Sequence, residues 1–134
     1  MKKQKVSDKK GSQEMRSVCP ISNTLDILGD KWTLLVVRDM FVGKKTFGEF
    51  LDSPEGIPTN ILADRLKRLE QHDIIDKTPY QQSPVRYAYQ LTYKGEQLND
   101  VMKAMIKWGL DNIPGTNAAM MDKSRLEIEG DSPE

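Results

Sequence analysis

The chain has 134 residues, and its 20 Lys and Arg balance its 20 Asp and Glu, so the formal net charge is zero. This length fits one domain with a modest core, near the size at which dimerisation often adds stability. No segment approaches the ~20 consecutive apolar residues that span a membrane, and the basic N-terminus is followed by no apolar signal core. These features exclude a membrane span and lead us to expect a cytoplasmic protein.

Charge is distributed unevenly along the chain. Residues 1–18 contain six Lys or Arg and two Asp or Glu, whereas residues 110–134 contain two and six. Residues 1–15 have almost nothing to bury, so we expect a disordered basic arm, either a solvated tail or a segment that touches DNA. Residues 114–134 are expected to form an acidic, disordered tail. A folded domain is left over residues 16–113.

Three short helices are predicted in the first part of this domain. The first spans residues 22–28, with a serine that can cap it, and ends at Gly29. The second spans about residues 31–40 and is closed by Gly43. The third spans residues 46–51 and opens with a Thr-Phe-Gly-Glu capping box. The apolar stripes are Ile21, Leu25 and Leu28 in the first helix, and Trp32, Leu35, Val36 and Met40 or Phe41 in the second.

The clearest helical pattern covers residues 58–71, after a turn at residues 52–57 in which Gly56 allows the reversal and Ile57 packs underneath. Leucines recur there at i, i+4 and i+7 and form a buried stripe. The stripe consists of Leu62, Leu66 and Leu69. The opposite face carries Asn60, Asp64, Lys67 and Gln71, with Ala63 and Arg68 at its edges. Such a face can enter a major groove.

Two β-branched and aromatic runs follow this helix, at residues 74–80 and 86–91, with a turn-rich tip at residues 81–84. A helix followed at once by a hairpin is the layout of a winged helix, in which the helix reads base edges and the hairpin tip reaches the neighbouring backbone. An ordinary α+β hairpin that caps a small core is an alternative of equal weight on pattern alone.

After the hairpin, Thr92 is expected to cap one long helix over about residues 93–112. Its apolar residues cover more surface than a terminal helix needs in order to lie on its own domain. They are Leu98, Val101, Met102, Met105, Ile106, Trp108 and Gly109. A second copy would bury the remainder, and Gly109 would permit close approach of the helices. We therefore expect a homodimer held by this helix, with help from residues 18–28.

Residues for catalysis or metal binding are scarce. One His and one Cys cannot make a closed metal site within a chain, and there is no phosphate loop, HExxH helix or nucleophile elbow, so we expect no enzyme and no cofactor. His72 lies near a helix C-terminus, where the helix dipole favours it. Cys19 lies at the edge of the first helix, where the dipole and Arg16 favour a thiolate. Its alternative role is that of a small buried hydrophobe.

Several spaced motifs occur between Cys19 and Gly109. They are Gly29-Asp30-Lys31-Trp32-Thr33-Leu34-Leu35, Arg38-Asp39, Thr46-Phe47-Gly48-Glu49-Phe50-Leu51, Gly56-Ile57, Leu62 with Arg65-Leu66 and Leu69, and Tyr87-Ala88-Tyr89-Gln90-Leu91-Thr92 with Gly95. Together they resemble the HxlR-type helix-turn-helix regulators, winged-helix relatives of the MarR repressors. The resemblance implies a winged helix-turn-helix fold, mainly α with a small antiparallel β wing. It also implies a bacterial transcription regulator that dimerises through its terminal helices.

The resemblance also bears on individual residues. In some members of that family a cysteine at this Cys-Pro position is a redox or electrophile sensor, and Cys19 aligns with it. Ala63 stands where the family usually has Thr or Ser, and Val85 interrupts the usual Pro-Pro-Arg of the wing. These two departures bear on which bases the protein would read, and not on whether it would bind DNA.

The function that we expect is sequence-specific DNA binding by a homodimer on an inverted-repeat operator. The expected base contacts are Thr59, Asn60, Ala63, Asp64 and Lys67, and the expected phosphate contacts are Lys44, Lys45, Arg68 and Arg86. Asp64 would accept from a cytosine amino group or be neutralised by Lys67 and Arg68. The alternative is a winged-helix module that binds protein rather than DNA, with which the zero net charge is compatible. A small-molecule enzyme fragment would need a polar pocket with perturbed titratable groups.

Overall fold

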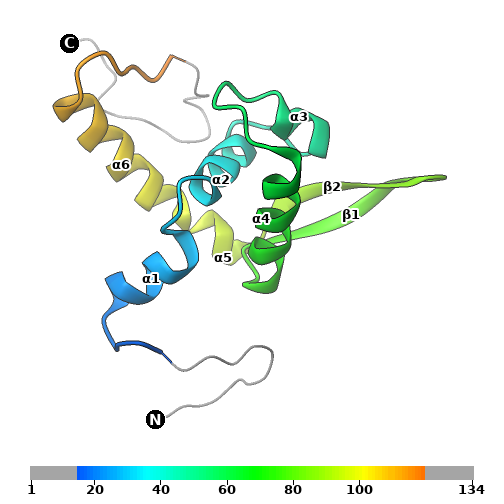
Figure 1. The fold of residues 1–134 in the computed structure, drawn as a ribbon, viewed down its shortest axis with the longest axis horizontal. Coiled ribbons are helices and arrows are strands. Elements are labelled where there is room, and N and C mark those ends of the chain that lie inside the picture. The colour runs from blue at the N-terminus through cyan, green and yellow to red at the C-terminus, as the bar shows by residue number, and fades with distance from the viewer. Residues whose placement is uncertain (1–14, 120–134) are drawn as a thin grey trace. The chain divides into compact units, whose positions relative to one another are not determined.

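The computed structural model describes residues 15–119 (Figure 1). Almost all of the expected basic arm and most of the expected acidic tail therefore lie outside the described residues. The elements are α1 (Pro20–Leu28), α2 (Thr33–Phe41), α3 (Phe47–Leu51), α4 (Thr59–Gln71), β1 (Ile75–Gln82), β2 (Val85–Leu91), α5 (Tyr93–Glu96) and α6 (Leu98–Asn112). The chain divides into two units, one ending at Asp30 and one beginning at Lys31.

Helix α1, in the first unit, starts two residues earlier than the sequence predicts. Its N-cap is Cys19, and Pro20 occupies the first helical turn, where the missing N–H costs nothing. The expected serine cap is therefore wrong, because Ser22 already lies inside the helix. Gly29 ends α1, as predicted. Ile21 and Leu25 of its apolar stripe are exposed, whereas Leu28 is buried.

The core of the second unit is assembled by α2, α3 and α4. Helix α4 packs against both α2 and α3. The buried apolar side chains of this unit include Val36, Val37, Met40, Phe41, Phe50, Ile57, Leu62, Leu66, Leu69, Ile74 and Ile75. Each fully buried side chain of this kind contributes about 1.5–3 kcal/mol of transfer free energy. The three leucines of α4 are all among them, which confirms the predicted stripe.

The connections around α3 follow the predicted chemistry. Gly43 closes α2 with a φ of 105°, and Gly56 lies in the turn before α4 with a φ of 71°. Both angles are in the left-handed region that glycine adopts without a Cβ penalty. The capping box of α3 is complete: the Thr46 hydroxyl accepts from the Glu49 amide at 3.3 Å, and the Glu49 carboxylate accepts from the Thr46 amide at 3.1 Å.

Helix α4 ends in a way that the sequence did not reveal. His72 is its C-cap, and Asp73 has a φ of 61°. The Ile74 amide donates to the Leu69 carbonyl at 2.9 Å and the Asp73 amide to the Glu70 carbonyl at 3.0 Å, which is the Schellman arrangement. Aspartate is one of the few residues other than glycine that visit this conformation. The turn leads directly from α4 into the buried start of the hairpin.

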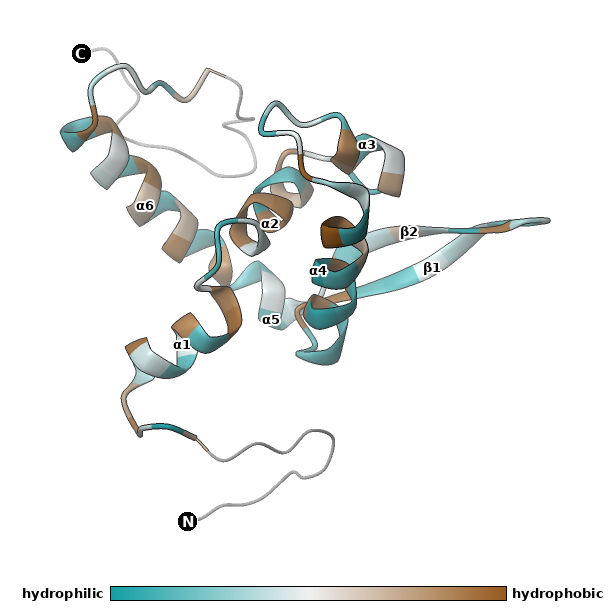
Figure 2. Cartoon of the chain, viewed as in Figure 1, coloured by the Kyte–Doolittle hydropathy of each residue, from teal (hydrophilic) through white to brown (hydrophobic). Residues whose placement is uncertain are grey.

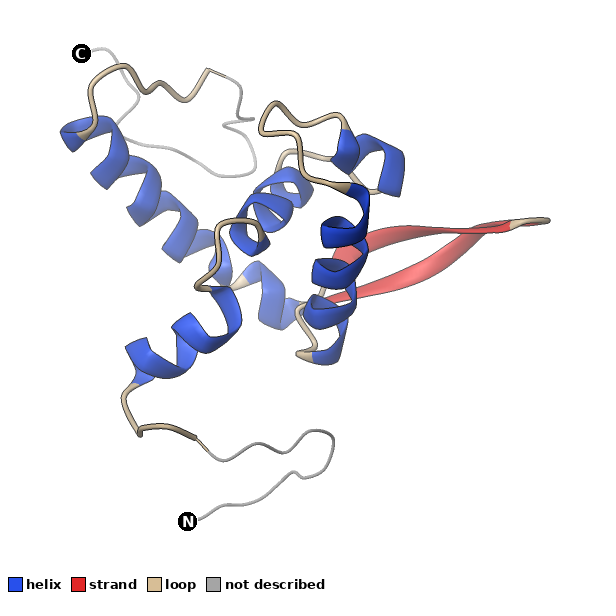
Figure 3. Ribbon diagram, in the orientation of Figure 1, coloured by secondary structure: helices blue, strands red, loops and turns tan. Residues whose placement is uncertain are grey.

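Strands β1 and β2 form an antiparallel hairpin that is longer than predicted and leaves only Ser83 and Pro84 at its tip (Figure 3). Ile75 pairs with Leu91 at the base, and the register shifts between Pro79 and Gln81. The chain before α3 joins this sheet, since Thr46 bridges Ala88 and the Tyr89 amide donates to the Lys45 carbonyl at 2.8 Å. Helix, turn, helix and hairpin thus form a winged helix.

The single C-terminal helix that we predicted is wrong: the chain forms the short α5 and then α6, with Gln97 between them. Thr92 caps α5 as expected, accepting from the Gly95 amide at 3.1 Å. A Cβ on Gly95 would lie 2.2 Å from the Ile74 carbonyl oxygen, so this turn is docked against the entrance to β1. Within residues 15–119, no helix combines the length and apolar character needed to cross a membrane.

Candidate nucleic-acid interface

The solvent face of α4 is the face that the leucine spacing predicts. Its exposed residues are Thr59, Asn60, Ala63, Asp64, Lys67 and Gln71, and Arg68 is half-buried at the edge. Figure 2 shows α4 as mainly hydrophilic, whereas α2 beside it is mainly hydrophobic. The helix therefore presents short polar and basic side chains to solvent from a backbone anchored by three buried leucines.

The charge on this face is partly compensated within α4. The helix has three cations and two carboxylates. Asp64 pairs with Arg65, its neighbour in sequence, a partner that helical spacing does not indicate. Arg65 is half-buried, whereas Asp64 is exposed. The pairing neutralises the carboxylate that would otherwise repel a DNA phosphate, and it leaves the exposed Lys67 as a cation on the same face.

The two lysines before α3 have different surroundings. Lys45 is exposed, and its backbone amide donates to Glu49 at 2.7 Å while its carbonyl pairs with β2. Lys44 is half-buried, and its ammonium donates to the Ser53 hydroxyl at 3.0 Å. Lys45 is thus held by its backbone with its side chain in solvent, whereas the Lys44 side chain is tethered to the turn before α4.

A groove of about 320 Å³ lies between the hairpin and the start of α3. Its lining residues are Thr46, Phe47, Gly48, Tyr80, Val85, Arg86, Tyr87 and Tyr89. Arg86 is exposed near the tip of the wing. At the base of the wing, the centroid of the Tyr89 ring lies 6.2 Å from the centroid of the Phe50 ring. Burial raises the pKa of the Tyr89 phenol. The base of the wing is therefore fixed to the core while the basic tip projects from it.

Lys77 connects this wing to α4. Its ammonium lies 3.6 Å from the Glu70 carboxylate and 4.4 Å from the centroid of the Tyr87 ring. A cation over an aromatic face is attracted by the ring quadrupole. Wing and α4 are therefore held together by a polar contact as well as by the shared core.

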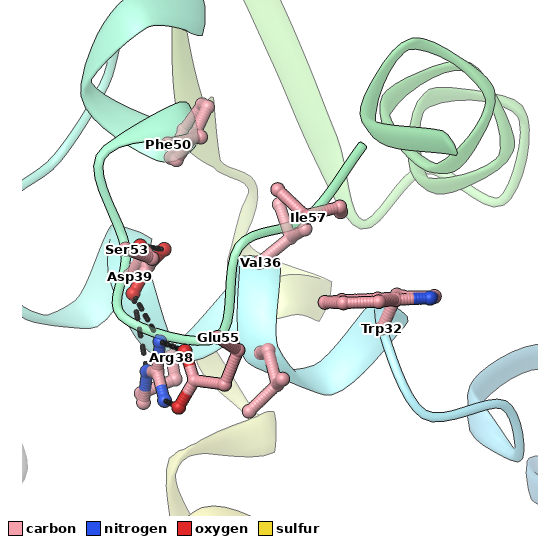
Figure 4. Close-up of a pocket in the computed structure, with 9 residues that line it drawn as sticks. Trp32, Val36, Arg38, Asp39, Phe50, Ser53, Glu55 and Ile57 are labelled. Atoms are coloured by element: carbon pink, nitrogen blue, oxygen red, sulfur yellow. Dashed lines mark hydrogen bonds and ion pairs between the residues drawn. The ribbon is translucent and has the colours of Figure 1, made fainter. Parts of the chain in front are cut away.

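Behind the interface, a network of charged side chains joins α2 to the turn at residues 52–57 (Figure 4). Arg38, which is 5% exposed, donates to both oxygens of Glu55 at 2.8 Å each. The same guanidinium donates to one Asp39 oxygen at 3.1 and 2.9 Å. The second Asp39 oxygen accepts from the Ser53 hydroxyl. The turn is thereby attached to α2 at two positions, Ser53 and Glu55.

These ion pairs set the protonation of the network. The paired Glu55 carboxylate is the main reason why the pKa of Arg38 is raised, and Arg38 in turn lowers the pKa of Glu55. The adjoining cavity, lined by Trp32, Val36 and Phe50 among others, has a volume of only about 10 Å³. A space of this size holds at most one water. The network is therefore part of the scaffold, with no room for a small-molecule substrate.

Cys19 lies in the first unit and is exposed, with a free thiol. It is not the buried hydrophobe that we considered as an alternative. The Ser17 hydroxyl accepts from its amide at 2.9 Å, and its carbonyl accepts from the Asn23 side chain at 2.9 Å. Arg16 forms an ion pair with Asp26 at 2.6 Å, which raises the pKa of the guanidinium. Arg16 is thus engaged by a carboxylate, and the thiol is accessible to solvent.

Both terminal helices leave large apolar side chains in solvent. On α1 and just before it these are Val18, Ile21 and Leu25, and on α6 they are Val101, Met105 and Trp108. Leu98, Ile106 and Gly109 are half-buried. Met102, which was expected on the same surface, is buried at 6% exposure.

Comparison with known proteins gives consistent matches. The model of the HxlR-like helix-turn-helix family matches residues 27–117. An uncharacterised HTH-type transcriptional regulator of Synechocystis sp. is 40% identical, over an alignment that covers 73% of this chain and 73% of that protein. The HTH-type transcriptional regulator YodB of Bacillus subtilis is 33% identical over 69% of this chain and 83% of its own.

Solved structures agree with the winged-helix architecture. The redox regulator HypR in its reduced form has a TM-score of 0.66 at 33% identity, covering 72% of this chain and 95% of that one. The reduced form of YodB from Bacillus subtilis has a TM-score of 0.61 at 30% identity, covering 75% and 100%.

Proposed function

Because the chain belongs to the HxlR-like helix-turn-helix family of transcriptional regulators, we propose that it binds DNA sequence-specifically, as a homodimer on an inverted-repeat operator. The observation that carries this proposal is the solvent face of α4, which is polar and basic, opposite a fully buried leucine stripe and beside a wing with an exposed arginine at its tip. A helix of this kind reads base edges while a wing contacts the backbone.

The residues of this surface divide by chemistry. Thr59, Asn60, Ala63, Asp64 and Lys67 are the proposed base contacts, because they project from the exposed face of α4. Lys45, Arg68 and Arg86 are the proposed phosphate contacts, since they carry cations on three neighbouring elements. Lys44 is the weaker member of that set, because its ammonium already donates to Ser53.

Homodimerisation is proposed from the apolar side chains that the protomer leaves in solvent. Val101, Met105 and Trp108 are 39%, 54% and 63% exposed, and they recur at i, i+4 and i+7 along α6. Exposed apolar stripes of this kind mark association surfaces. A two-fold axis would place two copies of α4 to meet successive major grooves ~34–36 Å apart, so the operator would be an inverted repeat.

A redox or electrophile response through Cys19 is a second, finer proposal. The exposed thiol supports it, as do the similar structures described as a redox regulator and as a reduced form of a regulator. Oxidation would convert the thiol to a sulfenate, a mixed disulfide or an intersubunit disulfide. An intramolecular disulfide is excluded, because the sequence contains one cysteine.

The test is selection of bound fragments from the host genome with purified protein, followed by sequencing. The proposal expects fragments that share an inverted repeat, bound with an affinity that falls as salt rises. Recovery of fragments without a common sequence would contradict specific recognition. Absence of binding to any duplex at low salt would instead favour a winged-helix module that binds protein.

A further inference from the structure

The turn that leads into α4 is held in place by a side-chain contact with α2. Glu55 lies four positions before Thr59, the first residue of α4, and both of its oxygens are bound by Arg38. Between them, Gly56 has a φ of 71° and Ile57 is buried. A displacement of Glu55 would therefore be transmitted over a few constrained residues to the start of the helix that faces DNA.

Stability alone does not account for this network. Arg38 is buried, whereas the Glu55 side chain is 37% exposed, so desolvation of the guanidinium and solvent screening of the carboxylate both offset part of their attraction. The distinctive property of a two-point contact between guanidinium and carboxylate is its fixed geometry. In this protein, Arg38 and Asp39 of α2 are both buried. The contact with Arg38 therefore fixes the position of Glu55, and with it the turn, relative to α2.

We propose that Glu55 is a positioning residue for sequence discrimination: held by Arg38, it fixes the turn and thereby the angle at which α4 meets base edges. This inference rests on the proposed function. Contacts with phosphates tolerate a small rotation of α4, because they depend mainly on charge and long side chains. Hydrogen bonds with base edges do not tolerate it. Glu55 therefore determines specific binding far more than non-specific binding.

The experiment compares two duplexes of equal length, one recovered by the genomic selection and one with the same bases shuffled. Affinities of the full chain for both are measured at one salt concentration, for wild type, Glu55→Gln and Asp52→Asn. Asp52 is the matched control, because it is exposed, lies three residues away in the same turn and loses the same charge. Glu55→Asp is added as a variant that keeps the charge and shortens the side chain by one methylene.

We expect Glu55→Gln to lower the ratio of specific to non-specific affinity about tenfold, as loss of one base contact does. The affinity for the shuffled duplex should change as little as it does in Asp52→Asn, which should keep the wild-type ratio. Glu55→Asp should lose specificity as well, since its shorter side chain cannot keep both contacts with Arg38. The ratio is insensitive to partial unfolding, because inactive protein lowers both apparent affinities by the same factor.

Three results would overturn the inference. Wild-type affinity of Glu55→Gln for both duplexes would separate the network from base readout. A proportional loss of both affinities would assign Glu55 to folding alone. A wild-type protein that binds the two duplexes equally would overturn the proposed function itself, and that outcome is recognised without any variant.

Discussion

At the scale of single residues, Glu49 shows how a side chain fixes the interface locally. Its carboxylate accepts from the amides of Lys45 and Thr46 at 2.7 and 3.1 Å. Those bonds, the Lys45 amide first, lower the pKa of Glu49. Helix α3 has only five residues, and helices this short have little stability in water without capping and tertiary contacts. The capping box thus supports α3 and also holds the backbone of Lys45.

A first prediction concerns the pH dependence of this cap. Because the folded-state pKa of Glu49 is lowered, its contribution is fully present above the unfolded-state pKa and is lost as pH falls through the folded-state pKa. Acid titration of the free energy of unfolding should therefore show a smaller decline in Glu49→Gln than in wild type. Thr46→Ala should cost about 1 kcal/mol at neutral pH. Parallel acid titrations for wild type and Glu49→Gln would contradict this role.

A second prediction at this scale concerns Cys19. Diamide or a mild peroxide should change the operator affinity of the wild-type protein reversibly, because the exposed thiol can be oxidised. Cys19→Ser should bind with wild-type affinity before treatment and should not respond afterwards. Affinity is measured before oxidant, after oxidant and after reduction. Equal responses from both proteins would place the sensitivity elsewhere, for example in methionines.

At the scale of elements, the sequence predicts what depends on local spacing. The leucines of α4 identify its exposed face, and the Thr-Phe-Gly-Glu box identifies the start of α3. The division between α5 and α6 escaped prediction. Gly95 of α5 lies against the carbonyl of Ile74, a long-range contact that local spacing does not indicate. The greater length of the hairpin escaped prediction too, since pairing extends strands beyond their apolar runs.

The network behind the interface was also missed, although the sequence contains a signal for it. Arg38 and Asp39 stand between Val37 and Met40 in an otherwise apolar helix, and a charged pair in such a place is buried only when it is bonded. The partner Glu55 could not be identified from spacing, because it is 17 residues away across two turns. Long-range polar pairing of this kind requires the fold.

A third prediction separates the roles of residues on α4. Asn60→Ala should relax specificity at one base position at a cost of about 1–3 kcal/mol, because an amide bonded to a base edge is lost. Arg86→Ala, at a proposed phosphate contact, should weaken binding to all sequences and lower the salt slope by about one. Lys67→Ala, at a proposed base contact, should weaken binding and also relax specificity. Gln71→Ala, at the exposed end of the same helix, is the control. Wild-type affinity of the folded Asn60 and Lys67 variants would refute the assignment of this face.

At the scale of the whole molecule, the exposed apolar surface and the net charge are both compatible with association of two copies. A net charge of zero gives little long-range repulsion between copies, so association is not opposed electrostatically. Helix α6 places Val101, Met105 and Trp108 in solvent on one side, while Lys107 and Asp111 pair at 2.8 Å on its polar side. On α6, Met102 is thus buried, whereas Val101, Met105 and Trp108 form an exposed apolar stripe, which we propose as the surface that binds a second copy.

The fourth prediction tests this stripe. Met105→Glu should break the homodimer, because association would bury an unpaired carboxylate at a cost of several kcal/mol. Operator affinity should fall with it, since a monomer presents one α4 instead of two to an inverted repeat. Lys107→Gln changes the net charge by the same amount on the opposite side of α6 and should remain dimeric. Sedimentation at micromolar concentration and binding to the palindrome are measured for each protein. A monomeric wild type, or a monomeric Met105→Glu variant that binds the palindrome with full affinity, would contradict the two-fold arrangement.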